Sequence, residues 1–144
     1  MLEHHTGVIE LTLPLDELRV LYVDDEAGLL DLIETYFRHY SDFDIDTAIS
    51  AQEGLRKLHL SPYDVIVSDY EMPEMNGIEF LLALRSEGNT IPFIIFSGRR
   101  REEIEMNILN AGADHYIQKG GNPMATFAEL KHHIIHTAAS NMAQ

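Results

Sequence analysis

Short apolar runs alternate with longer segments of helical period along this chain, and the pattern recurs five times. Two of the runs, at 65–67 and 93–96, are apolar at successive positions, which is typical of strands covered on both faces by helices. The pattern therefore predicts a central, mostly parallel sheet. Its strands are expected at 19–23, 43–49, 64–68, 93–96 and 114–118.

The segments between the strands carry apolar residues three or four positions apart, which predicts one buried stripe for each helix. The last helix has a clear start, because Asn122 can cap it and Pro123 suits its first position; we expect it to end near residue 139. Right-handed crossovers then favour an open, doubly wound α/β sheet with strand order 2-1-3-4-5. The stripe residues are Leu29, Leu30, Ile33, Tyr36, Phe37 and Tyr40; Ile78, Leu81, Leu82 and Leu84; Ile104, Ile108 and Ala111; Phe127, Leu130 and Ile134.

Residues 1–17 precede this repeat. Ile9, Leu11 and Leu13 alternate with polar residues and Pro14 ends the alternation, so the extension is either a short edge strand or a loose tail. Residues 18–144 are expected to form one domain, since 144 residues with 45% apolar content can enclose a single core.

Composition excludes several classes of protein. The formal net charge of −14 opposes contact with nucleic acid phosphates, and no apolar run approaches the roughly 20 residues that a membrane span needs. The chain has no cysteine, which excludes disulfides and thiolate sites and suits a reducing compartment. We therefore expect a cytoplasmic protein that contacts neither nucleic acid nor membrane.

Polar residues gather where the predicted strands end, which is where open α/β sheets bind their ligands. Asp24 and Asp25 follow the first strand, and Asp69 follows the third. Like charges so close together persist if a cation is present. Mg²⁺ suits the position, because it takes one or two carboxylates and leaves other positions open for phosphate oxygens.

Asp69 is placed to attack phosphorus and form an acyl phosphate, because it ends a buried strand beside this metal site. Lys119, after the fifth strand, would balance the charge of an incoming phosphoryl group, and the Ser97 hydroxyl would donate to one of its oxygens. Pro73 and Gly77 have a structural interpretation, as residues that set backbone angles in a strand-to-helix turn. Taken singly, Ser97 fits a helix cap and Lys119 a surface lysine; taken together, they indicate phosphoryl chemistry.

This combination resembles the receiver domain of two-component response regulators, from about residue 18 to the last helix. The resemblance implies a flavodoxin-like (βα)5 fold. The residues that carry it are Asp24 and Asp25 after 21–23, Asp69 with Met72, Pro73 and Gly77, Ser97 and Gly98 after 94–96, and Tyr116 three residues before Lys119.

The resemblance also implies roles for single residues. Asp69 would accept a phosphoryl group from the phosphohistidine of a sensor histidine kinase or phosphotransfer protein. Asp25 would bind Mg²⁺ directly and Asp24 through water. Asp69 and the backbone carbonyl of Glu71 would complete the protein ligands, with Asp24 and Lys119 assisting the reaction.

Signalling would use Ser97 and Tyr116 as a switch, in which the hydroxyl moves toward the phosphoryl group and the ring follows it inward. The fourth helix, fifth strand and last helix would then report the change to an output partner or to a second copy. No effector domain is recognisable, so we expect the output to be a protein contact, unless the chain is part of a longer protein. The sequence does not name the partner. The only chemistry expected is self-phosphorylation and its hydrolysis.

Two local features refine this interpretation. Gly120 follows Lys119 where the family has proline, often with a cis bond; because a cis bond before a non-proline residue costs about 2.5 to 4 kcal/mol, we predict a trans bond. Glu71 and Arg99 hold opposite charges at positions that the resemblance implies tune hydrolysis. They either pair across the mouth of the site or act as independent surface charges.

Two other functions compete with this one. A Mg²⁺-dependent phosphohydrolase would turn over an external substrate through an aspartyl phosphate, but that class typically places its nucleophile in an Asp-x-Asp run on the first strand, unlike Asp24-Asp25-Glu26. A docking module that is never phosphorylated would not need the complete set of acidic, hydroxyl and lysine residues.

Overall fold

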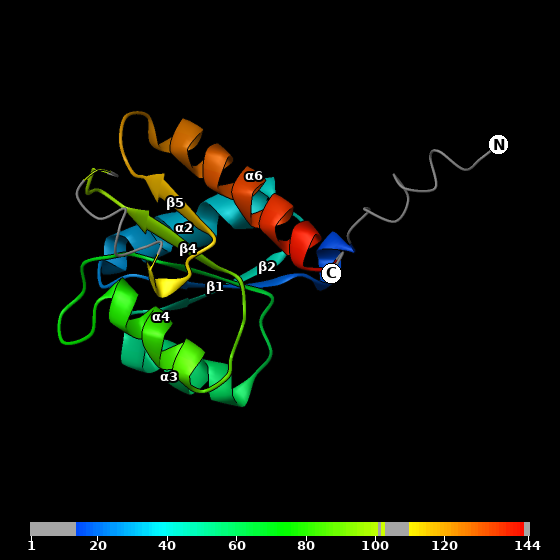
Figure 1. Ribbon diagram of the computed structural model, residues 1–144. Helices are drawn as coiled ribbons and strands as arrows, with labels where there is room; N and C mark the ends of the chain where they lie inside the picture. The colour runs from blue at the N-terminus through cyan, green and yellow to red at the C-terminus, as the bar shows by residue number, and fades with distance from the viewer. Residues whose placement is uncertain (1–13, 101, 103–109, 143–144) are drawn as a thin grey trace.

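The computed structural model describes residues 14–100, 102 and 110–142, and these form a five-stranded sheet with helices on both faces (Figure 1). The strand order is β2-β1-β3-β4-β5 and every neighbouring pair is parallel, which confirms the predicted α/β fold. Each strand boundary lies within one residue of the predicted one. The strands are β1 (Arg19–Val23), β2 (Asp44–Ala48), β3 (Val65–Ser68), β4 (Phe93–Ser97) and β5 (His115–Gln118).

The helices form two layers, with α2 and α6 on one face of the sheet and α3 and α4 on the other (Figure 1). The last helix starts at Pro123 as predicted and runs about one turn beyond the expected end at residue 139. No helix among the described residues is both long and apolar enough to cross a membrane. The helices are η1 (Leu15–Glu17), α2 (Ala27–Tyr40), α3 (Ala51–Leu60), α4 (Gly77–Ser86) and α6 (Pro123–Met142).

Some predictions fall outside the described part of the chain. These are the alternation at Ile9, Leu11 and Leu13 and the helical stripe at Ile104 and Ile108. The described end of the extension, η1, is a short 3-10 helix, and its Leu15 packs against the core on the α2 and α6 side.

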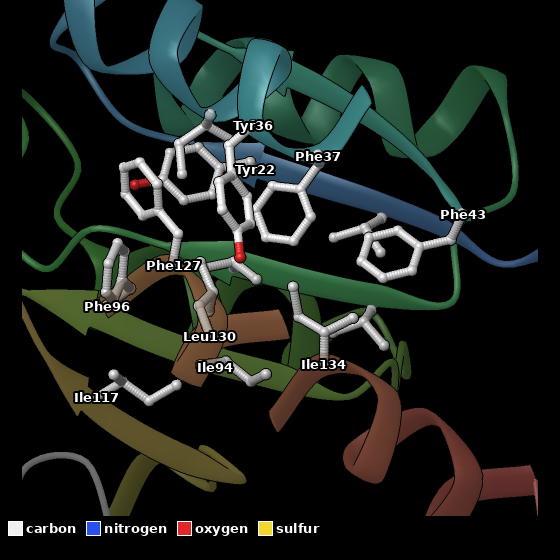
Figure 2. Packing of buried hydrophobic residues seen from close by; sticks show 14 of the residues in the cluster. Tyr22, Tyr36, Phe37, Phe43, Ile94, Phe96, Ile117, Phe127, Leu130 and Ile134 are labelled. Carbon is white, nitrogen blue, oxygen red and sulfur yellow. The ribbon is translucent and has the colours of Figure 1, made fainter. Parts of the chain in front are cut away.

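Alternation along the strands divides the core into two clusters. Val20 and Tyr22 of β1 point toward α2 and α6, whereas Leu21 and Val23 point toward α3 and α4. Figure 2 shows the first cluster, in which the rings of Tyr36 from α2 and Phe127 from α6 lie 5.3 Å apart between centroids. β1, β3 and β4 therefore have both faces covered, which the apolar runs at 65–67 and 93–96 predict for β3 and β4.

β2 lies at one edge of the sheet, where unpaired backbone groups can recruit a strand from another chain. Successive residues point their N–H and C=O groups alternately to the two sides of a strand. Because Asp44 and Ala48 are bonded to the β1 side, Thr47 directs its backbone groups toward the open side. An incoming strand would need these two groups.

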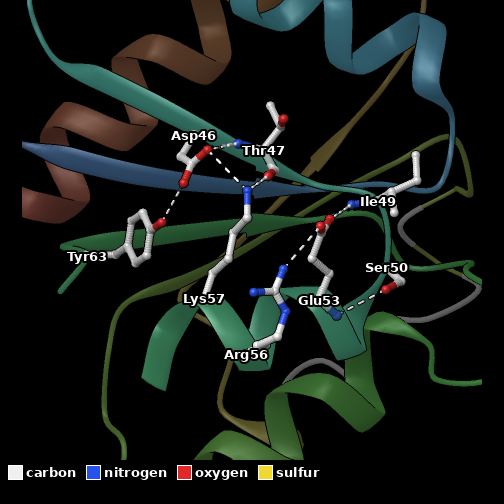
Figure 3. Close-up of polar contacts among 8 residues, drawn as sticks. All are labelled: Asp46, Thr47, Ile49, Ser50, Glu53, Arg56, Lys57 and Tyr63. Carbon is white, nitrogen blue, oxygen red and sulfur yellow. Dashed lines mark hydrogen bonds and ion pairs between the residues drawn. The ribbon is translucent and has the colours of Figure 1, made fainter. Parts of the chain in front are cut away.

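Side chains already occupy both groups of Thr47 (Figure 3). Its N–H donates to Oδ1 of Asp46 at 2.9 Å, and the Lys57 ammonium donates to its carbonyl at 2.6 Å. The Tyr63 hydroxyl donates to Oδ2 of Asp46 at 2.6 Å. Burial raises the pKa of Asp46, but the Tyr63 hydroxyl and the Lys57 charge outweigh it and hold that pKa below its ordinary value. We call Asp46, Lys57 and Tyr63 the edge cluster.

Replacing Lys57 by methionine should expose this edge. The Thr47 carbonyl loses its partner, so we expect Lys57→Met to lower the free energy of unfolding by about 1 kcal/mol and to speed self-association. Arg56→Met is the matched control, since Arg56 is also on α3 but pairs with Glu53 at 3.5 Å. Urea unfolding and light scattering at matched folded fraction would measure both effects. Equal association rates for the two variants would contradict the blocked edge.

Candidate functional site

The carboxyl ends of the strands bring together the residues predicted to carry chemistry. Asp24 and Asp25 follow β1, and Asp69 follows β3. One carboxylate oxygen from each of the three lies within 4.8 Å of the others. Ser97 ends β4, and Lys119 comes directly after β5. The sheet order thus brings together, at the carboxyl ends of the strands, residues that are up to 95 positions apart in sequence.

Lys119 provides the positive charge between two of the carboxylates. Its Nζ lies 2.8 Å from Oδ2 of Asp24 and 3.6 Å from Oδ2 of Asp69. The ammonium also lies 5.5 Å from the centroid of the Phe96 ring. Its backbone N–H donates to the Ser97 carbonyl at 2.7 Å, which fixes the start of the loop after β5.

Glycine shapes the backbone after this lysine. The Lys119–Gly120 bond is trans, as predicted, and the described residues contain no cis peptide bond. Gly121 has a φ of 63°, a left-handed conformation that glycine adopts without steric cost. The Thr126 hydroxyl donates to the Gly120 carbonyl at 2.6 Å. The loop is therefore anchored to α6 by a hydrogen bond.

Asp24 is the most deeply placed of the three carboxylates. It is 0% exposed, and its Oδ1 accepts the Glu26 N–H at 3.0 Å. With Lys119 on Oδ2, each oxygen has a donor. Asp25, the next residue, is exposed. The pair therefore combines a buried, held carboxylate with one open to solvent.

Asp69 is 9% exposed and lies in the wall of an open cleft. The Tyr70 N–H donates to its Oδ1 at 2.7 Å. Burial raises the pKa of Asp69 to about 6; the Lys119 charge opposes this rise, and the negative charge of Asp24 adds to it. The rise is therefore mainly an effect of burial, since the Lys119 charge outweighs the repulsion from Asp24. A divalent cation beside Asp69 would favour its ionised form further.

Gly77 determines how closely α4 approaches Asp69. A Cβ at this position would lie 2.4 Å from the Asp69 carbonyl oxygen, and the Gly77 N–H donates to the Tyr70 carbonyl at 2.8 Å. Glycine is needed here because of this close approach, rather than for backbone angles. Asn76 and Glu79 cap the helix reciprocally, each side chain accepting the other's backbone N–H at 2.8 Å.

The mouth of the site is an open cleft of about 460 Å³. Nη2 of Arg99 lies 2.6 Å from Oε2 of Glu71 across it, so these charges pair, which is one of the two alternatives that the sequence left open. The Arg99 guanidinium also lies 5.5 Å from the centroid of the Tyr70 ring. The lining residues are Glu26, Asp69, Glu71, Ser97, Gly98, Arg99, Arg100 and Lys119.

The two predicted switch residues both bond to the backbone of Arg99. Ser97 is 2% exposed, and its Oγ accepts the Arg99 N–H at 3.3 Å. Tyr116 is 7% exposed, and its hydroxyl donates to the Arg99 carbonyl. Sequence reasoning missed this link, because a backbone contact over 17 residues leaves no local signal. The predicted fourth helix, which follows Arg99, lies largely outside the described residues.

The acidic group fits a hard cation. It offers only oxygen ligands, and one of its three carboxylates is exposed, as suits an ion that keeps some of its water. Among the described residues, it is the one group of three or more acidic, histidine or cysteine side chains with this convergence.

Comparison with known proteins gives consistent results. A family model described as the response regulator receiver domain matches residues 20–131. The response regulator SaeR of Staphylococcus aureus (strain USA300) is 33% identical over 104 residues. This match covers 72% of the chain but 45% of SaeR, so the chain corresponds to less than half of that relative.

Solved structures share the fold. The receiver domain of the Francisella response regulator 1452 is 29% identical with a TM-score of 0.77, and the match covers 87% of this chain and 99% of that one. The chemotaxis protein CheY4 of Vibrio cholerae is 26% identical with a TM-score of 0.73, over 82% and 98% of the two chains. The strand order, the residues gathered at the strand ends and these matches together show that the chain belongs to the family of response regulator receiver domains of two-component systems.

Proposed function

We propose that the chain accepts a phosphoryl group on Asp69 in a Mg²⁺-dependent reaction and signals through the resulting change of shape. One observation carries this proposal: the Asp69 carboxylate lines an open cleft, beside two other carboxylates and with the Lys119 ammonium 3.6 Å away. The donor would be the phosphohistidine of a sensor histidine kinase or phosphotransfer protein.

The reaction is a transfer between two groups. An ionised Asp69 oxygen attacks phosphorus, a P–O bond forms, and the P–N bond to the donor imidazole breaks with its electrons returning to nitrogen. Asp24, Asp25, Asp69 and the Glu71 carbonyl would hold Mg²⁺, which supplies charge neutralisation for the phosphoryl oxygens. The Tyr70 N–H holds Oδ1 and thereby orients the nucleophile.

Lys119 and Ser97 would recognise the transferred group. The ammonium already lies near Asp69 and needs only to turn from the carboxylates toward the new phosphoryl oxygens. The Ser97 hydroxyl accepts from the Arg99 N–H, and its own hydrogen bond to Asp69 is one of the contacts that oppose the rise that burial causes in the pKa of that carboxyl. Its motion toward the phosphoryl group would strain the bond to Arg99.

Signalling would then pass through Arg99. Its N–H is bonded to Ser97 and its carbonyl to Tyr116, so a shift of the hydroxyl moves the partner of the tyrosine. The helix predicted between β4 and β5, together with β5 and α6, would report the change to an output partner or to a second copy. In this function the only chemistry is self-phosphorylation and its hydrolysis.

Further proposals concern the domain boundaries, the cell compartment and contact with nucleic acid. Residues 18–144 would be the receiver domain and 1–17 an extension. We place the protein in the cytoplasm, in line with its lack of cysteine, and away from nucleic acid, in line with its charge of −14.

Asp69→Asn should abolish labelling by acetyl phosphate, because the amide keeps the volume but lacks the nucleophilic oxygen. Intact-mass spectrometry would detect the added phosphoryl group, and circular dichroism would check the fold. Asp16→Asn, in η1 at the other end of β1, is the control and should label normally. A phosphoryl group on Asp69→Asn would refute the assignment.

Asp25→Ala should weaken Mg²⁺ binding and labelling together, by about tenfold or more, because an oxygen ligand is lost. Calorimetric titration with Mg²⁺, without any phosphodonor, tests the metal site by itself. Unchanged Mg²⁺ affinity would show that Asp25 is not a ligand.

The pair of Glu71 and Arg99 should slow the loss of the phosphoryl group by hindering an in-line water. Their side chains are 59% and 42% exposed, so the effect should be at most several-fold and weakened by salt. We expect Glu71→Ala and Arg99→Ala each to speed dephosphorylation, and the double variant to add little. Fully additive effects, or slower hydrolysis in Glu71→Ala, would exclude a shared lid.

A further inference from the structure

Four of the eight histidines gather where α6 lies against the start of β5. The centroids of their rings form a chain, with 5.1 Å between His115 and His133, 5.7 Å between His133 and His132, and 6.1 Å between His132 and His136. Histidine is the commonest metal ligand among side chains. The four imidazoles therefore form a group of ligand residues outside the acidic site.

Topology separates this group from the acidic site. His115 is the first residue of β5, whereas Lys119 comes directly after the strand, at its opposite end. Ile117 of β5 packs in the core cluster beneath α6, so alternation along the strand directs His115 toward the same helix. β5 is an edge strand of the described sheet. The contact between His115 and His133 therefore joins the edge of the sheet to α6.

The spacing of these two rings suits a shared ion. With Zn–N bonds of about 2.0 to 2.1 Å and tetrahedral angles, two imidazoles on one zinc ion have their centroids roughly 5 Å apart. The rings of His115 and His133 lie at 5.1 Å and are inclined at 52°, so they do not stack face to face. The His133 side chain is 30% exposed, which leaves a path for an ion and its water.

A carboxylate accompanies this pair. Oε2 of Glu129, one turn before His133 on α6, lies 3.9 Å from Nε2 of that histidine. A histidine that binds metal usually donates its other ring N–H to such a group, which orients the ring. Burial lowers the pKa of His133, and the three neighbouring imidazoles lower it further, although the Glu129 charge opposes them. The His133 imidazole is therefore neutral at neutral pH, as a metal ligand must be.

We propose that His115 and His133 form a binding site for Zn²⁺, with Glu129 in the outer shell and water completing the coordination. Imidazole nitrogen suits Zn²⁺, whereas Mg²⁺ prefers oxygen ligands, so the two ends of the sheet would select different ions. The described residues offer no group of three ligand side chains that converges here, which is why water is needed. The bound ion would tie β5 to α6, and its binding does not require phosphorylation of Asp69.

Glutamine variants of the two histidines test the site. Calorimetric titration of the full chain with zinc chloride, under saturating Mg²⁺ to occupy the acidic site, should show binding by the wild-type protein. His115→Gln and His133→Gln should each weaken it by about tenfold or more, since the loss of a mere supporting contact already costs 10- to 100-fold. His59→Gln is the control and should bind as the wild type does, because His59 pairs only with Glu87, at 3.2 Å. Circular dichroism would check that each variant is folded.

Nuclear magnetic resonance adds a readout that names the ligands. The ring resonances of His115 and His133 should shift together as one equivalent of Zn²⁺ is added, and those of His59 should stay in place. Wild-type zinc affinity in both His115→Gln and His133→Gln would overturn the proposal. Binding that is lost in His132→Gln but kept in His115→Gln would overturn it as well, since the ion would then be held by His132 and His136 within α6 alone.

Discussion

The burial of two neighbouring carboxylates at the end of the sheet is the constraint on which this structure depends. Asp24 and Asp69 come from neighbouring strands, and Lys119 holds them together at 2.8 and 3.6 Å from its ammonium. The lysine reaches them because β5 ends beside β4 and its loop is anchored there. Burial still raises the pKa of Asp69 to about 6, although the Lys119 charge outweighs the repulsion from Asp24. A cation bound beside these carboxylates would therefore stabilise their ionised forms.

Sequence predicts most of the frame, because the frame depends on large apolar residues. β1, β3 and β4 are continuous apolar runs, and the rule that ligands bind beyond strand ends was enough to place Asp69 and Lys119. α3 shows where this reasoning weakens. Its fully buried residues are Ala51 and Gly54, which carry no strong hydrophobic signal.

Contacts between distant segments were beyond prediction for a different reason. The requirement for glycine at 77 comes from a carbonyl eight residues earlier, across a turn whose path the sequence does not specify. The bonds of Ser97 and Tyr116 to the backbone of Arg99 depend on side-chain orientations that only the packed core determines. Residue types indicate which chemistry is present, whereas packing decides which groups meet.

The edge cluster beside β2 affects how the sheet can pair with strands of related proteins. Sheets of one topology share the same strand spacing, so an open edge on one is a suitable partner for a strand of another. At Thr47, both outward backbone groups are already bonded within the chain, so a foreign strand gains no hydrogen bond there. The edge cluster thus removes two of the backbone groups that a strand from another member of the fold would need.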